Sequence, residues 1–110
     1  DILHIEDACE IIFLQIKKLK KINNTVFNIG GGPKNKISLK ELTLKCEKLT
    51  NNKIYISKVP KTSKLDVPYF VTDNTKISKF YNWRPLLNVD MLLNDIYRWL
   101  KENKKFKNYF

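Results

Sequence analysis

The chain has 110 residues, 43% of them hydrophobic, and a formal net charge of +10 at pH 7. This length suffices for one small domain with one core, and no run of about 18 apolar residues is present to span a membrane. Only Arg84 and Arg98 among the 21 basic residues are arginine, whereas base readout and bidentate phosphate binding favour arginine. We interpret the charge as a solvated lysine surface. The alternative is a binding stripe for nucleic acid or another polyanion.

The two cysteines, Cys9 and Cys46, are too few for a disulfide framework in a chain of this size. Both fall on the apolar stripes of expected helices, where a reduced cysteine packs as a small hydrophobe. Buried, reduced cysteines favour a cytoplasmic location. The chain opens on Asp1 rather than Met and shows no signal-peptide pattern, so we expect a fragment of a longer protein.

The first expected helix covers residues 7–21, with Asp7 as its N-cap and Glu10 completing a capping box. Its inward stripe follows the helical period and consists of Cys9, Ile12, Phe13, Ile16 and Leu19. Ile11 and Leu14 widen this stripe, so we expect the helix to be buried on more than one side. Residues 25–29 are predicted to form a short strand, which must turn at Gly30-Gly31-Gly32-Pro33.

A second capping box, Ser38 with Glu41, is predicted to open a helix that extends to about Leu49. Two further strands are expected at 53–59 and 67–72, with a polar loop between them.

A short helix capped by Asp73 or Asn74 should follow and end at Asn82, a residue type that tolerates the left-handed backbone. The last helix covers about 89–102, with an inward stripe of Val89, Leu92, Leu93, Ile96, Trp99 and Leu100. This order of elements predicts an α/β or α+β fold.

The residues by themselves assemble no catalytic centre. Gly30-Gly31-Gly32 matches neither a P-loop nor a dinucleotide fingerprint, because Pro33 interrupts and the helix begins later. The run is either a strand-to-helix turn or a loop whose backbone lies close to a ligand. His4 is the only histidine, so no metal set is expected around it.

Asp66 and Asp73 flank an apolar, aromatic segment. A carboxylate at the mouth of such a loop can accept hydrogen bonds from a ribose diol or a nucleobase. The simpler interpretation, a turn or capping aspartate, is favoured by the residues alone.

Five motifs, in order, resemble those of the extended short-chain dehydrogenases, the NAD-dependent nucleotide-sugar epimerase and dehydratase family. The matching segments of this chain are residues 1–8, 26–32, 38–42, 66–77 and 82–85. The family patterns that they resemble are, in the same order, R-D-x-x-H-V-x-D-x-A, F-N-I-G-x-G, S-L-x-E-L, D … D-x-x-K-I and G-W-x-P. Within this family, the sequence F-N-I-G-G at residues 27–31 is most similar to that of the CDP-paratose (CDP-tyvelose) 2-epimerases.

The resemblance implies an α/β fold in which this chain is a C-terminal piece: a late strand of a Rossmann-type sheet, Val26 to Ile29, plus the small α+β substrate-binding lobe. Residues 1–104 would form this substrate-binding region and 105–110 a basic aromatic tail. NAD and the catalytic Tyr-x-x-x-Lys pair would belong to residues before Asp1. No catalytic residue, metal or bound cofactor is therefore expected in this chain.

The resemblance also implies substrate contacts to a nucleoside-diphosphate sugar. Asp66 would contact the nucleoside, Ile2 would lie near the phosphates, and Leu39 would line the base pocket. Ser63 replaces the family's arginine, so phosphate neutralisation could pass to Lys61 or Lys64.

The function expected is therefore the nucleotide-sugar-binding portion of an NAD-dependent epimerase or dehydratase, inactive alone. Its partners would be the nucleotide sugar and the missing N-terminal Rossmann part, with nucleic acid and membrane not expected. The alternatives are a small polyanion-binding module and a structural remnant of a truncated epimerase.

Overall fold

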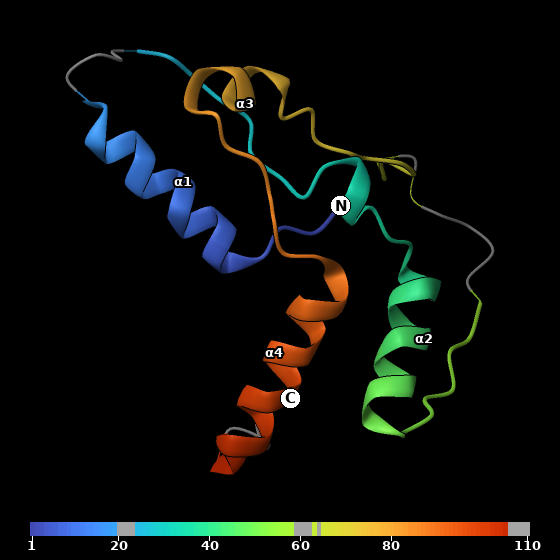
Figure 1. Ribbon diagram of the computed structural model, residues 1–110. Helices are drawn as coiled ribbons and strands as arrows, with labels where there is room; N and C mark the ends of the chain where they lie inside the picture. The colour runs from blue at the N-terminus through green and yellow to red at the C-terminus, as the bar shows by residue number, and fades with distance from the viewer. Residues whose placement is uncertain (20–23, 59–62, 64, 106–110) are drawn as a thin grey trace.

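A computed structural model describes residues 1–19, 24–58, 63 and 65–105. It contains four α-helices in these ranges: α1 (Ile5–Lys17), α2 (Leu39–Thr50), α3 (Thr75–Tyr81) and α4 (Val89–Glu102), with a 3₁₀ turn η2 (Pro33–Asn35) after the glycines. In Figure 1, α1 lies beside α3 and α2 lies beside α4, and the two pairs diverge from the centre of the molecule. None of the helices in the described part is long and apolar enough to cross a membrane.

The expected Rossmann-type strand and α+β lobe are wrong for this structure, because no strand or sheet occurs in the described ranges. A strand needs the backbone of a neighbouring strand to pair with. Residues 25–29 instead place the Phe27 ring 5.5 Å from that of Tyr81 in α3. The Val26 carbonyl accepts a hydrogen bond from Lys76 Nζ at 2.8 Å. Side-chain contacts to a helix, not a backbone ladder, hold this segment.

The other two expected strands, 53–59 and 67–72, are also irregular where they are described; residue 59 lies outside the described residues. The Ile54 N–H donates to the Glu47 side chain at 3.2 Å, and Thr72 N–H donates to Asp1 Oδ2 at 3.1 Å. Both backbone donors thus bind carboxylates instead of another strand. Alternating or β-rich composition alone did not create a pairing partner.

The helices were better predicted. α4 has the expected bounds, and α2 begins with the expected capping box: the Ser38 hydroxyl accepts from Glu41 N–H while the Glu41 carboxylate accepts from Ser38 N–H. Asn51 and Asn82 both take the left-handed backbone, with φ of 52° and 54°, and end α2 and α3. Helix caps are formed by residues that are neighbours in the sequence, so their positions could be predicted from the sequence.

For the first helix, the predicted N-terminus and most of the predicted buried face are wrong. It begins at Ile5 and is capped by His4, not by Asp7. Of the expected apolar face, the widening residues are the ones covered: Ile11 is fully buried and Leu14 packs against the core. The main stripe is exposed, with exposed fractions of 48–63% for Ile12, Phe13, Ile16 and Leu19. Cys9, expected to be buried, is also exposed. Of the predicted helix, residues 20 and 21 lie outside the described residues.

The core is small. Ile11, Ile77, Tyr81 and Trp83 form its buried cluster, and Leu3, Leu14 and Phe27 pack against it. Within α4, only Val89 of the predicted inward stripe is buried, while Ile96 and Trp99 are nearly half exposed. The radius of gyration is 17.3 Å, against about 13 Å expected of a compact domain of this length. The described chain is therefore open, with much apolar surface uncovered.

Replacing Ser38 with alanine is expected to destabilise the chain by about 1 kcal/mol, since it removes the acceptor for Glu41 N–H. The Ser38 hydrogen bonds also hold the pKa of Glu41 below its ordinary value of 4.5. A lowered folded pKa stabilises above the unfolded value and loses its effect as pH falls. The variant also loses the hydrogen bond from the Ser38 hydroxyl to the Glu41 carboxylate. That part of the cost should be present above about pH 5 and shrink toward pH 3, whereas the lost acceptor for Glu41 N–H costs the same throughout. Urea denaturation across this range tests it, with Ser57→Ala in the exposed 53–58 segment as control.

Candidate functional site

The glycine turn crosses two other segments of the chain at very short range. A Cβ on Gly31 would lie 1.9 Å from the Ile2 carbonyl oxygen, and one on Gly30 would lie 2.2 Å from Thr72 Oγ1. Gly32 has φ of 69°, a backbone conformation that residues other than glycine rarely adopt. The atoms that crowd these glycines belong to the protein itself. The strand-to-helix-turn interpretation is thus wrong about the strand but right that the glycines serve a turn.

The same geometry tests whether the turn fits NAD. A dinucleotide site needs free backbone N–H groups at a helix N-terminus. Here Gly32 N–H donates to Asp1 Oδ2 at 2.6 Å and Gly30 N–H donates to Asn74 Oδ1 at 3.1 Å. The Gly30 and Gly32 donors and the space beside Gly30 and Gly31 are already used by the protein, so this turn does not have the geometry of a dinucleotide-binding turn.

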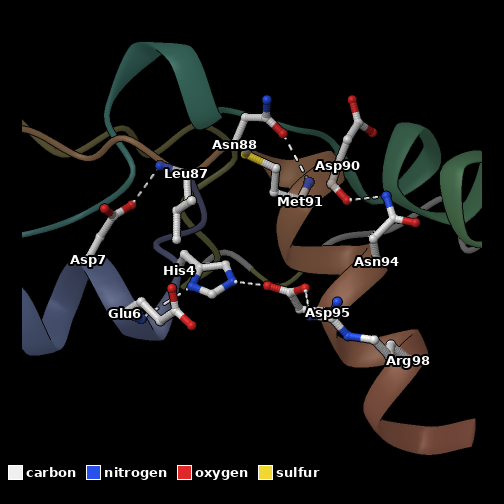
Figure 2. Close-up of polar contacts among 10 residues, drawn as sticks. All are labelled: His4, Glu6, Asp7, Leu87, Asn88, Asp90, Met91, Asn94, Asp95 and Arg98. Atoms are coloured by element: carbon white, nitrogen blue, oxygen red, sulfur yellow. Dashed lines mark hydrogen bonds and ion pairs between the residues drawn. The ribbon is translucent and has the colours of Figure 1, made fainter.

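Two polar residues near the start of α1 tie distant parts of the chain together (Figure 2). The buried Asp7 carboxylate accepts hydrogen bonds from Leu86 N–H and Leu87 N–H at 3.1 and 3.0 Å. The buried His4 caps α1 and contacts Asp95 of α4 at 3.2 Å. The sequence analysis missed both roles. No local signal could have found the Asp7 contact, because its partners lie about 80 positions further along the chain.

Asp66 and Ser63, two expected site residues, lie together in one exposed turn. Ser63 N–H donates to Asp66 Oδ2, and Asp66 N–H donates to the Ser63 carbonyl oxygen, at 3.2 and 3.1 Å. One carboxylate oxygen therefore holds the turn, and Oδ1 makes no hydrogen bond or ion pair with the part of the chain that the structure describes. Lys61 and Lys64, the expected substitutes for the arginine, lie outside the described residues.

Leu39, expected at the base pocket, lines an apolar groove between α2 and residues 53–58. The cavity has a volume of about 690 Å³ and is lined by Leu39, Lys40, Thr43, Leu44, Glu47, Ile54, Ile56, Ser57 and Lys58. Leu39 itself is 83% exposed, so its side chain is free to cover a flat ring. Lys40 and Lys58 give the lining two positive charges and Glu47 gives it one negative charge, beside the apolar side chains.

Ile2 lies elsewhere. Its backbone N–H donates to the Asn35 carbonyl oxygen at 3.1 Å, and its own carbonyl faces Gly31. The structure therefore brings Ser63 and Asp66 together, whereas Leu39 belongs to the groove and Ile2 to the glycine crossing.

Asp73, the second expected carboxylate, caps the start of α3 rather than facing a ligand. Its Oδ1 accepts from Thr75 N–H at 2.8 Å, and hydrogen bonds from Thr75 lower the pKa of this exposed carboxyl group. Asn74 contributes its side chain to Gly30 instead of to the helix. The capping interpretation is correct for Asp73.

A Tyr-x-x-x-Lys spacing does occur in the chain, at Tyr97 and Lys101 of α4. The Lys101 ammonium group lies over the Tyr97 ring, 4.4 Å from its centroid. This is a cation–π contact, which places the charge on the ring face and not beside the hydroxyl group. The geometry gives the pair a structural explanation, and we assign it no catalytic role.

The sequence is similar to two curated epimerases. It is 31% identical to a CDP-paratose 2-epimerase of Salmonella typhi over 99 residues, which cover 90% of this chain and 29% of that protein. It is 32% identical to a UDP-glucuronate 4-epimerase of Thermodesulfobacterium geofontis over 91 residues, or 80% of this chain and 27% of that protein. No protein-family model matches.

The chain spans less than a third of the length of these curated relatives. It is related to the nucleotide-sugar epimerase and dehydratase family, as the motif order indicated.

Proposed function

We propose that this chain is the nucleotide-sugar-binding portion of an NAD-dependent nucleoside-diphosphate-sugar epimerase or dehydratase and is inactive alone. The observation that carries the proposal is the similarity to an epimerase along 90% of the chain but only 29% of the epimerase. The two matched proteins are named for different nucleotides and sugars. The class of ligand is thus supported better than the particular sugar or base.

The Leu39 groove is the site we propose for the nucleobase. Its wall is apolar, as binding pockets for flat rings generally are, and Lys40 and Lys58 at the rim can attract the diphosphate. Asp66, whose Oδ1 is unpaired among the described residues, would accept a hydrogen bond from the nucleoside. Ile2 and Ser63 remain proposed contacts on the phosphate side.

The exposed apolar side of α1 supports the proposal that another part of the protein packs against this helix. Ile5, Ile12, Phe13, Ile16 and Leu19 have exposed fractions between 48% and 72%, and an exposed patch of this kind usually marks an interface. We propose that the N-terminal Rossmann part of the same protein covers it and supplies NAD and the catalytic pair. The proposal places the protein in the cytoplasm, with residues 1–104 as the substrate-binding region and 105–110 as a tail.

The test is an NMR titration of the full ¹⁵N-labelled chain with CDP-glucose, UDP-glucuronate and NAD. We expect the nucleotide sugars to shift the amides of the Leu39 groove and of the Ser63–Asp66 turn, and NAD to shift neither. Leu39→Ala removes three carbon groups, whose full burial is worth about 2.4 kcal/mol, so it should weaken binding by about tenfold if they are partly buried and about 60-fold if fully buried. Leu86→Ala, another exposed leucine outside the groove, is the matched control.

Two results would contradict the proposal. The first is no response to either nucleotide sugar at millimolar concentration. The second is an equal response to inorganic polyphosphate or duplex DNA, which would favour the polyanion-binding alternative. Binding of that kind should also disappear steeply between about 50 and 200 mM salt.

A further inference from the structure

His4 is held by two different partners through its two ring nitrogens (Figure 2). It is only 5% exposed. Nδ1 accepts a hydrogen bond from the Glu6 backbone N–H at 3.2 Å, which caps α1. Nε2 lies 3.2 Å from Asp95 Oδ2 on α4. One side chain therefore joins the start of α1 to the middle of α4.

These contacts select one form of the imidazole ring. A nitrogen that accepts from a backbone N–H must carry a lone pair, so Nδ1 is unprotonated. The proton of the neutral ring then sits on Nε2 and is donated to the Asp95 carboxylate. The capped state of α1 corresponds to the neutral Nε2–H tautomer of His4.

Protonation changes both contacts in opposite directions. A proton on Nδ1 removes the acceptor and sets two N–H groups against each other, so the cap on Glu6 N–H is lost. The Nε2–H bond to Asp95 becomes an ion pair, which strengthens it. Asp95 stays in place because its other oxygen accepts from Arg98 Nη2 at 2.6 Å.

The charged groups that face His4 belong to α1 and α4. The hollow that His4 lines also contains Glu6, Asp95, Arg98 and Glu102. Three carboxyl groups and one guanidinium group therefore share this hollow with the ring. The two contacts of the ring differ in kind, because Nδ1 accepts from a backbone N–H whereas Nε2 faces a carboxylate.

We propose that His4 is a pH-dependent switch between capping α1 and pairing with α4. The neutral ring caps α1 through Nδ1. The protonated ring releases Glu6 N–H, so the first turn of α1 loosens while the α1–α4 connection tightens. Histidine is the side chain whose ordinary titration range lies near neutral pH. The switch needs no ligand and does not depend on the proposed function.

NMR of the full chain between pH 8 and pH 5 tests the switch without any substitution. At pH 8 the His4 Nδ1 resonance should be that of an unprotonated nitrogen. As the ring titrates, exchange of the Glu6 amide proton, corrected for its intrinsic pH dependence, should accelerate about fivefold, the equivalent of one lost cap. A protonated Nδ1 at pH 8, or a Glu6 amide unchanged while the ring titrates, would overturn the proposal.

Matched variants separate the two contacts. Asn at position 4 offers a carbonyl oxygen near the place of Nδ1, so His4→Asn should keep Glu6 protected at every pH. Gln extends toward the place of Nε2, so His4→Gln should leave Glu6 exchanging fast at every pH. Asp95→Asn should retain the Glu6 step but remove the tighter α1–α4 connection at pH 5. A pH-dependent Glu6 step in His4→Asn would assign the effect to another group and refute the switch.

Discussion

Replacing Asp7 with alanine is expected to lower the free energy of unfolding by about 3 kcal/mol or more. The carboxylate is 3% exposed and accepts from two backbone donors, Leu86 N–H and Leu87 N–H. Hydrogen bonds to a charged group are worth about 1.5–3 kcal/mol each, and the alanine variant loses both. With so small a core, the variant should be largely unfolded at 25 °C.

Urea denaturation followed by circular dichroism measures this effect. Asp7→Asn keeps one acceptor oxygen and should fall between the wild type and the alanine variant. Asp90→Ala is the matched control, because Asp90 is exposed and pairs with Lys45 on the surface, a contact worth about 1 kcal/mol at most. Equal midpoints for Asp7→Ala and Asp90→Ala would show that Asp7 does not hold residues 86 and 87 in solution.

The second large effect concerns the proposed substrate contact. In the epimerase or dehydratase that this chain is proposed to form part of, Asp66→Asn should raise the KM for the nucleotide sugar by roughly 10- to 150-fold, with kcat nearly unchanged. A charge-assisted hydrogen bond is worth about 1.5–3 kcal/mol. A contact to the nucleoside is remote from the reacting carbon, so it stabilises substrate and transition state equally.

Asparagine is the informative replacement because its side-chain oxygen can still accept from Ser63 N–H and keep the turn. Ser63→Arg, which introduces the arginine that the family resemblance implies at this position, should lower the KM if an arginine there reaches the diphosphate. Steady-state kinetics of both variants measures these changes in KM and kcat. A large fall in kcat would place Asp66 in the chemistry, and unchanged kinetics would leave it as a turn residue.

The helix ends could be predicted from the sequence, whereas the covered faces could not. The Ser38–Glu41 box and the left-handed Asn82 are formed within a few residues, so their chemistry is complete in the local sequence. The inward side of α1 was predicted only in part, because that helix is apolar on most of its circumference. Periodicity could not choose between Ile11, which is buried, and Phe13, which is exposed.

The candidate site was also predictable from the sequence only in part. Leu39 and Asp66 were selected by resemblance, and the structure adds a groove around the first and a turn around the second. The roles of His4 and Asp7 escaped detection. Asp7 looked like a helix cap because it precedes an apolar run, yet its carboxylate is turned toward another segment and His4 provides the cap.

The sequence by itself determined the positions of α2, α3 and α4 within a few residues and the relationship to epimerases. Caps, left-handed asparagines and motif order are properties of neighbouring residues. Only the tertiary structure decided that residues 25–29 pack on α3 without forming a strand, and that Gly31 makes room for the Ile2 carbonyl. Only it placed His4 against Asp95. Each of these depends on a partner more than 25 positions away, and local propensity carries no information about which distant atoms will meet.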